Sequence, residues 1–353
     1  MRQPTRACRR AAALLLVLVL TLGLVPTAGA AAGNVSEVWS DTGAYLCRTV
    51  PDPQVGTVGG EWAVLGLARS GYPVPTGYFD TYYKNLTQYV TACGGQLHSK
   101  KYTEYSRVVL AVTSLGKDAR SVAGYDLTKP LKDYDKVIWQ GLNGPIWALL
   151  ALDSGNYPSL EEIRQKYVDY ILARQLGSGG WSFNGTDADP DLTCMALQAL
   201  AKYQDQAAVS GAVQKALTCL SGMQNADGVF SSWGTANAES CAQGIVALTE
   251  LGLSIDDSRF VKNGKTLLDA LLTFYRPGQG FVHASGETAS NAMATEQAFY
   301  ALAALQRQQA GQGSLYRMTD DTSSVEDLIR QGIFRQAGDL VQAARRLLLQ
   351  QMQ

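Results

Sequence analysis

The sequence predicts an all-α protein, an α/α toroid whose helical hairpins close into a ring. A phrase of small and leucine-rich residues returns six times, with ends about 40 to 55 residues apart. A more polar segment, whose apolar residues recur at helical spacing, precedes each copy. Each polar segment and the apolar copy after it are therefore predicted to form a helical hairpin. The first and last apolar copies are about as apolar as the middle ones, whereas an open stack of repeats needs polar end caps. Closing the six hairpins into a ring removes the ends.

The apolar copies are predicted to be the helices of an inner barrel, because they are small or apolar on nearly every face. They span residues 62–71, 106–116, 144–155, 193–203, 242–252 and 295–306. The intervening segments carry apolar residues at helical spacing and charges on the other side, as expected of half-buried outer helices. They span residues 37–50, 77–93, 129–141, 159–175, 208–224 and 258–275.

Residues 1–30 have the pattern of a secretory signal peptide. Four arginines precede the apolar run 11–25, and the small residues at 28–30 offer a cleavage position near Ala30. We therefore expect a secreted or cell-surface-associated protein. No later stretch reaches the roughly 20 apolar residues of a membrane span, so no transmembrane segment is expected. The toroid is assigned to residues 34–306 and a C-terminal helical extension of open role to residues 320–353.

The charge of the mature chain disfavours nucleic acid as a partner. Residues 1–30 hold four arginines and no acid, so their removal leaves 26 basic against 31 acidic side chains. Phosphate contacts need a basic footprint, which this balance does not supply. The sequence leaves any protein partner and the oligomeric state open. The mature cysteines are odd in number, so at least one thiol is left over in any disulfide scheme, and their pairing stays open: Cys47, Cys93, Cys194, Cys219 and Cys241.

Two junctions before inner helices share one spacing of a glutamine, three residues, a glycine, one residue and an aromatic. Their glycines are predicted to form tight turns with positive φ, and we expect Gly180 to be such a position. The glutamine side chain is expected to cap backbone amides of the turn, and the aromatic ring to fill the gap between hairpins. The two copies are Gln175, Gly179 and Trp181, and Gln224, Gly228 and Phe230.

This spacing on an apolar helical repeat resembles the QW motif of the terpenoid cyclase and protein prenyltransferase superfamily. The resemblance covers residues 35–306 and is greatest to secreted bacterial prenyltransferase or squalene oxidase repeat proteins. It extends more distantly to the toroid domain of cobalamin carriers. The resemblance implies an α/α toroid, but one fold hosts many chemistries, so function has to come from the site.

Two aspartates flank Pro190 at the predicted start of the fourth inner helix. Class II terpenoid cyclases protonate an alkene with the middle aspartate of a D-x-D-D motif at a comparable place, so the resemblance makes Asp189 and Asp191 candidate catalytic acids. The fourth motif position holds Leu192, and the acid that would sharpen the proton donor is missing. An acid here also satisfies free amides as an N-cap or opposes the helix dipole from the first turn. Capping is favoured, and ligand contact and acid catalysis stay open.

A metal site is not expected. Protein prenyltransferases of the same superfamily bind zinc through Asp, Cys and His, but their D-x-C spacing is absent because Asp191 and Cys194 are three residues apart. The cysteines of the inner helices are more simply buried core residues. We expect neither a metal nor a cofactor, although potential ligand types occur at Asp191, Cys194, Cys241, His98 and His283.

A ligand site is expected where the inner helices begin, because ring closure brings their starts to one rim. A concave pocket with aromatic walls and a few fixed polar groups is the usual small-molecule site. The alternative is that each polar or aromatic residue at these helix starts only caps its own helix or a neighbouring one. The predicted ligand-binding residues are Glu61, Trp62, Tyr102, Glu104, Trp147, Asp191, Glu239 and Glu296.

Two classes of function remain open. The favoured one is an exported protein that binds a bulky, partly apolar small molecule, such as a corrinoid, an isoprenoid or a glycan, at this rim without catalysis. The alternative is an enzyme, either a cyclase-like acid catalyst using Asp189 and Asp191 or a glycan-cleaving toroid with two carboxylates across a cleft. Export argues against the cyclase, since polyprene substrates are held in membranes inside the cell.

Overall fold

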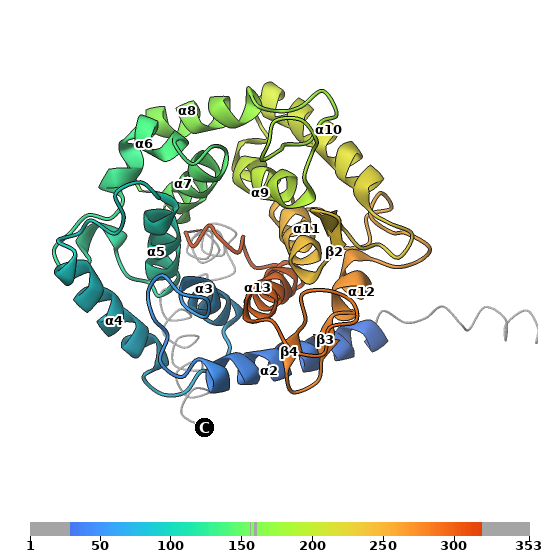
Figure 1. Ribbon diagram of the computed structural model, residues 1–353, viewed down its shortest axis with the longest axis horizontal. Coiled ribbons are helices and arrows are strands. Elements are labelled where there is room, and N and C mark those ends of the chain that lie inside the picture. The colour runs from blue at the N-terminus through green and yellow to red at the C-terminus, as the bar shows by residue number, and fades with distance from the viewer. Residues whose placement is uncertain (1–28, 156, 159–160, 320–353) are drawn as a thin grey trace, which may run out of the picture.

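Two concentric rings of helices make up the protein (Figure 1). The computed structural model describes residues 29–155, 157–158 and 161–319. The predicted C-terminal extension, residues 320–353, and all but the last two residues of the predicted signal peptide lie outside these. Among the described helices, none has both the length and the apolar character of a membrane span.

The inner ring is closed. Each of its helices packs against the next along the chain, and the last packs against the first, which excludes an open superhelix. Trp62 and Glu296 therefore lie in the same barrel, on neighbouring helices. The inner helices are α3 (Glu61–Ser70), α5 (Thr103–Ser114), α7 (Asn143–Ser154), α9 (Pro190–Leu200), α11 (Ala238–Glu250) and α13 (Ala292–Gln309).

The outer helices surround this barrel (Figure 1) and alternate with the inner ones along the chain. They are α2 (Gly29–Thr49), α4 (Tyr78–Ala92), α6 (Tyr134–Ile138), α8 (Glu161–Leu172), α10 (Ala207–Met223) and α12 (Leu267–Leu272). Short 3-10 helices η1 (Ala119–Ser121), η2 (Lys129–Lys132) and η3 (Ala201–Tyr203) lie between them. Two small antiparallel hairpins pair β1 (Ser231–Ser232) with β2 (Thr235–Ala236) and β3 (Tyr275–Arg276) with β4 (Gly280–Phe281).

Two outer segments are less helical than their apolar spacing predicts. Within 258–275 only α12 is α-helical, because Asn263 and Gly264 turn the chain with φ of +49° and +78°, and Thr266 then starts the helix through a capping box with Asp269. Within 129–141 the chain forms η2 and then α6, divided at Asp133, whose side chain accepts the N–H of Lys136. Turn-forming residues here override the periodic pattern.

The glutamine side chains of the two turns bond carbonyl oxygens and not the backbone amides that the sequence led us to expect. Nε2 of Gln175 donates to the carbonyl oxygens of Gly179 and Ala212 at 2.7 and 2.8 Å, so the side chain satisfies carbonyls rather than amides. Gln224 does the same with Gly228 and Phe260. Each glutamine thus ties its own turn to the following outer segment. The aromatic rings of Trp181 and Phe230 are fully buried, as expected of gap-filling residues.

The prediction of a positive φ at Gly180 is wrong, because it is Gly179 that has φ of +96°. Gly180 is instead constrained by packing: a Cβ built on it would lie 2.6 Å from Cβ of Ala188 and 2.9 Å from Oγ1 of Thr193. Oγ1 of Thr193 accepts the N–H of Trp181 at 3.0 Å, which holds the turn against the start of α9.

Residues 311–319, which we call the central segment, turn back from α13 across the middle of the ring (Figure 1). Nε and Nη2 of Arg69, at the end of α3, donate to the carbonyl oxygens of Leu315 and Ser314 at 2.9 and 2.7 Å. The N–H of Leu315 donates to Glu250 at the end of α11. The segment therefore closes the barrel at the carboxyl ends of its helices.

Tyr316 of the central segment is fully buried in the barrel. Its ring makes an edge contact with Trp147 of α7, and its hydroxyl donates to Oε1 of Gln198 on α9 at 3.3 Å. Two residues further on, the N–H of Met318 donates to the carbonyl of Ser154 at the end of α7. The cysteines of the described residues are all free thiols, and those on α9 and α11, Cys194 and Cys241, are buried.

Candidate functional site

A funnel opens at the amino ends of the inner helices. It consists of two hollows, of about 340 and 250 Å³, that share the side chains of Met195, Gln243 and Gln297. These three residues lie in the first two turns of α9, α11 and α13. Because the central segment covers the opposite ends of the helices, the funnel opens on one side of the ring only.

One hollow has aromatic walls, and we call it the aromatic hollow. The rings of Trp62 and Trp147, from α3 and α7, lie 4.8 Å apart between centroids, and Tyr300 of α13 is 6.2 Å from Trp62. The guanidinium-bearing Arg107 completes the lining on the side of α5. This combination presents flat apolar faces beside a guanidinium group that is paired with Glu61 and Glu104.

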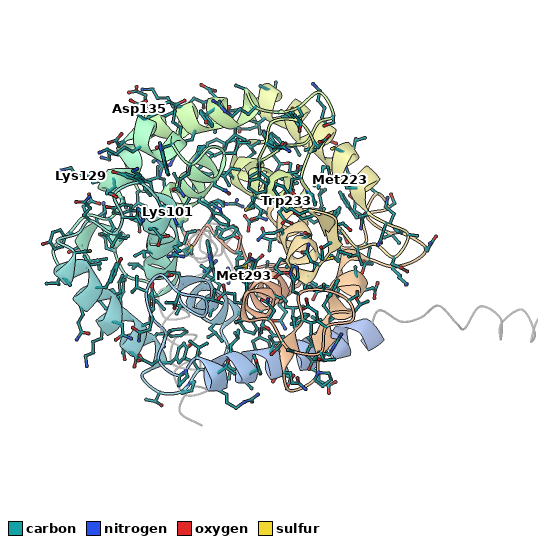
Figure 2. The ribbon with its side chains drawn as sticks, viewed as in Figure 1. Lys101, Lys129, Asp135, Met223, Trp233 and Met293 are labelled. Carbon is teal, nitrogen blue, oxygen red and sulfur yellow. The ribbon has the colours of Figure 1, made fainter. Side chains whose placement is uncertain are left out.

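The other hollow, the acidic hollow, lies against α9 and α11. Asp191, Glu239 and His283 line it together with Trp233 and Met293. Figure 2 shows Trp233 and Met293 near the central opening of the ring. Nδ1 of His283 is 2.9 Å from Oε2 of Glu239, so these two side chains form a hydrogen-bonded pair at the edge of the hollow.

The two aspartates at the start of α9 have different environments. Asp189 is the N-cap: its Oδ1 accepts the N–H of Leu192 at 3.0 Å, and its Oδ2 accepts the hydroxyl of Ser232 at 2.7 Å. Asp191 lies in the first turn, and its buried Oδ1 accepts no hydrogen bond from the described residues. Pro190 separates them at the first helical position, where a missing N–H has no consequence.

Burial raises the pKa of the Asp191 carboxyl to about 6. The hydroxyls of Ser240 and Ser232 oppose this rise, whereas the negative charges of Asp189 and Glu239 add to it. A carboxyl group with this pKa holds or releases a proton close to neutral pH. Asp191 is therefore the group in the acidic hollow best suited to donate either a proton or a hydrogen bond to a bound molecule.

A chain of glutamines below the funnel was not foreseen as part of the site. Nε2 of Gln198 donates to Oε1 of Gln243 at 2.8 Å, and Nε2 of Gln243 donates to Gln297 and to the hydroxyl of Tyr300. Tyr316 of the central segment donates to Gln198 at the other end. A glutamine inside an otherwise apolar inner helix was the available sequence signal, because a buried amide needs partners.

Four of the predicted ligand residues line the funnel, namely Trp62 and Trp147 in the aromatic hollow and Asp191 and Glu239 in the acidic one. Glu61 and Glu296 do not line these hollows, because both are buried where the first hairpin meets the last. Glu296 accepts the N–H of Gly59 at 2.7 Å, and burial raises the pKa of its carboxyl to about 7.

Glu61 lies beside Glu296 and also has a raised pKa because of burial, which the positive charge of Arg107 opposes. It accepts the N–H of Gly56 at 3.0 Å and contacts Nε of Arg107 at 3.4 Å. Glu104 pairs with the same Arg107, and Tyr102 is buried against Tyr105. Neither lines the two hollows, so their predicted contact with a ligand has no geometric support here.

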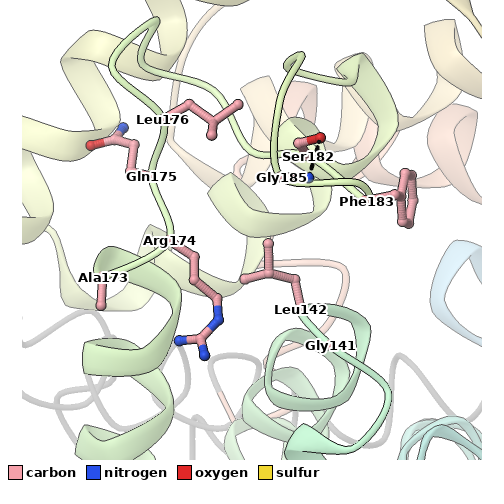
Figure 3. A pocket seen from close by; sticks show the side chains of 9 residues that line it. All are labelled: Gly141, Leu142, Ala173, Arg174, Gln175, Leu176, Ser182, Phe183 and Gly185. Carbon is pink, nitrogen blue, oxygen red and sulfur yellow. Dashed lines mark hydrogen bonds between the residues drawn. The ribbon is translucent and has the colours of Figure 1, made fainter.

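Metal ligands are not assembled in the described residues: no group of three or more His, Cys, Asp or Glu side chains lies close enough to hold an ion. A further hollow, of about 390 Å³, lies outside the inner barrel between the end of α8 and the loop at 182–185 (Figure 3). Arg174 supplies its one charged lining side chain. It lacks the carboxylates and paired aromatics of the funnel, so we do not assign the site to it.

No protein-family model and no curated protein matches the sequence. Solved structures do resemble the fold. A variant of MstE, a type II terpene cyclase from Scytonema, in complex with the substrate geranylgeranyl dihydroxybenzoate, has a TM-score of 0.53 at 14% identity, over 78% of this chain and 98% of that chain.

Two toroid structures with glycan-related names match equally well. Unsaturated glucuronyl hydrolase from Bacillus sp. GL1, described as responsible for glycosaminoglycan degradation, has a TM-score of 0.54 at 13% identity, over 80% of this chain and 98% of that chain. Polysaccharide lyase BACCELL_00875 has a TM-score of 0.54 at 12% identity, over 79% and 98%. The chain thus has an α/α-toroid fold like that of these structures, and at these identities the likeness concerns the fold alone.

Proposed function

We propose that this is an exported toroid protein that binds a bulky, partly apolar small molecule in the funnel without turning it over. One observation carries the proposal: the two hollows share a floor, so one ligand can contact Trp62 and Trp147 on one side and Asp191 and Glu239 on the other. Ligand sites in proteins commonly combine such apolar walls with a few fixed polar groups. Export rests on the signal-like pattern of residues 1–30.

The shape of the site favours a ligand with an apolar body and polar groups. The aromatic rings offer large contact area. At the shared floor, Nε2 of Gln297 is available to a polar substituent, whereas Nε2 of Gln243 already donates to Gln297 and Tyr300. A corrinoid, an isoprenoid with a polar head or a glycan each has this character. Removing an aromatic wall should weaken binding more than removing one carboxylate, because a stacked ring contributes more contact area than a partly hydrated charge contributes attraction.

Calorimetric titration of the chain that follows the predicted signal peptide, with cobalamin, a polyprenol and neutral oligosaccharides, tests the proposal. We expect one class to bind, with Trp62→Ala weakening binding about tenfold or more and Glu239→Gln less. Trp139→Ala is the matched control, because Trp139 is an exposed tryptophan that lines neither hollow. Absence of heat with all three classes, or equal loss in Trp62→Ala and Trp139→Ala, would overturn the assignment.

Acid catalysis is the second candidate, and the environment of Asp191 favours it. A carboxyl group with a pKa raised to about 6 and an unpaired Oδ1 beside a hollow is a reasonable proton donor. Incubation with the same three ligand classes followed by chromatography distinguishes the two functions. Product formation that is abolished in Asp191→Asn but kept in Asp205→Asn, an exposed aspartate that lines neither hollow, would replace the binding function by catalysis.

A further inference from the structure

Two large aromatic side chains are exposed at the outer rim of the funnel, where both also line the edge of the acidic hollow. Phe183, from the loop before α9, has 45% of its surface exposed, and Trp233, at the tip of the β1–β2 hairpin, has 79%. Their rings are stacked, with centroids 6.4 Å apart and planes 29° apart. Because the two residues come from different loops, the pair is built by the tertiary fold. Exposed aromatic surface of this kind points to an interaction site rather than to core packing.

The backbone holds Trp233 in an unfavourable conformation. Trp233 has φ of +51° and Gly234 has φ of +81°, as in the type I′ turns that connect two-residue hairpins. Asparagine and glycine are preferred at such positions, and a bulky side chain there is an outlier. Neither core packing nor turn geometry therefore explains a tryptophan at this position. A strained backbone position that carries an exposed ring points to a function for that ring.

Polar groups surround the aromatic pair on its outer side. Phe183 and Trp233 also line a hollow of about 240 Å³, together with Asn184, Asp187 and Asp189. Oδ1 of Asn184 accepts the N–H of Thr186 at 3.0 Å, which fixes the amide plane, and its Nδ2 donates to none of the described residues. Asp187 is exposed, and its Oδ2 accepts only the hydroxyl of Thr186 in the described part of the chain. The hollow thus offers free donors and acceptors next to the rings.

We propose that Phe183 and Trp233, with Asn184 and Asp187, bind a neutral sugar ring of a glycan. A pyranose presents C–H groups on its face, which stack on an aromatic ring, and hydroxyls at its edge, which both donate and accept hydrogen bonds. The amide of Asn184 supplies donors and the carboxylate of Asp187 an acceptor. The carboxylates of Asp187 and Asp189 repel an acidic sugar, and the polar lining disfavours a purely apolar chain. This sugar subsite adds to the proposed function and can fail independently of it.

A glycan array with neutral, acidic and amino sugars, followed by calorimetry with the neutral oligosaccharide that binds, tests the subsite. We expect neutral glycans to bind, with a loss of about tenfold or more in Trp233→Ala and of several-fold in Asp187→Asn. Trp139→Ala, a second exposed tryptophan, should leave binding unchanged. Trp233→Asn separates binding from folding: asparagine suits the turn, so the melting temperature should hold or rise while glycan binding is lost.

Several outcomes would overturn this subsite. They are absence of glycan binding at millimolar concentration, binding to acidic sugars alone, or equal effects of Trp233→Ala and Trp139→Ala. Binding of choline that is lost in Trp233→Ala would replace the sugar by a quaternary ammonium ligand. If glycans fail but cobalamin or a polyprenol binds in a manner that depends on Trp62, the subsite is wrong and the funnel assignment stands.

Discussion

At the scale of single residues, sequence position identified the helix start but not the division of roles within it. Spacing placed Asp189 and Asp191 at the start of α9 and left capping open for both. Only Asp189 caps, because its side chain accepts the N–H of Leu192, three residues further on, and the hydroxyl of Ser232 from the next hairpin. The contact with Ser232 joins residues 43 positions apart in the chain, so the spacing of residues around Asp189 could not predict it.

Asp191 should make stability depend on pH. Its folded pKa of about 6 exceeds the ordinary 3.8, so between about pH 4 and 6 the folded state holds a proton that the unfolded chain has released. The contribution of Asp191 to stability therefore falls as the pH rises through this window and is constant above it. Relative to the wild type, Asp191→Asn should gain about 1–3 kcal/mol between pH 4 and pH 7. Urea unfolding at several pH values measures this, and a difference between Asp191→Asn and the wild type that does not change with pH would contradict it.

Substitution of Gly180 should destabilise the fold because of the size of the added side chain, and substitution of Gly179 because of its backbone conformation. Gly180→Ala should destabilise by about 1–3 kcal/mol, because the new methyl group meets Ala188 at 2.6 Å. Adding Ala188→Gly removes that contact and should recover part of the loss. The same second change should not rescue Gly179→Ala, whose strain comes from φ of +96° and a backbone contact with Lys215. Thermal melts of the single and double variants test the distinction, and equal rescue of both would refute it.

At the scale of elements, the inner helices were predictable and the outer ones only in part. A continuous apolar segment such as α7 has one plausible place, inside the barrel, because no face of it suits water. The outer segments keep a polar face, so their helices can end wherever a turn is favourable. Asn263 and Gly264 end the periodicity of 258–275 in this way, although the apolar spacing continues through them.

The glutamine of each turn should contribute more to the stability of the fold than an exposed glutamine nearby. Gln175→Ala leaves the carbonyls of Gly179 and Ala212 without their side-chain donor, which should lower stability by about 1–3 kcal/mol. Gln214→Ala, at an exposed position on α10, is the matched control and should change stability by less than about 0.5 kcal/mol. Chemical denaturation compares the two variants, and equal midpoints would show that the turn does not need the glutamine.

At the scale of the whole molecule, ring closure was predictable but the central segment was not. The apolar first and last repeats required partners, and α3 and α13 provide them for each other. Residues 311–319 contain only a short apolar stretch around Leu315 and Tyr316, with no period that a sequence reading could use. Their place follows from the barrel, whose helix ends present Arg69 and Glu250 to a returning backbone. The same closure turns the predicted rim into a funnel with one opening.

The central segment should stabilise the ring as one cooperative unit. Tyr316 contacts Trp147 of α7 and Gln198 of α9, while the adjacent Leu315 is bound by Arg69 of α3 and Glu250 of α11. Tyr316→Ala empties a fully buried site and should cost about 3–5 kcal/mol, by analogy with other large aromatic truncations. Tyr316→Phe loses only the hydrogen bond to Gln198 and should cost about 0.5–1.5 kcal/mol. The near-ultraviolet circular dichroism of the aromatic side chains and the far-ultraviolet signal of the helices should melt together in both variants. A Tyr316→Ala protein that melts at the wild-type temperature, or in two separate steps, would mean that the inner ring holds itself together without this segment.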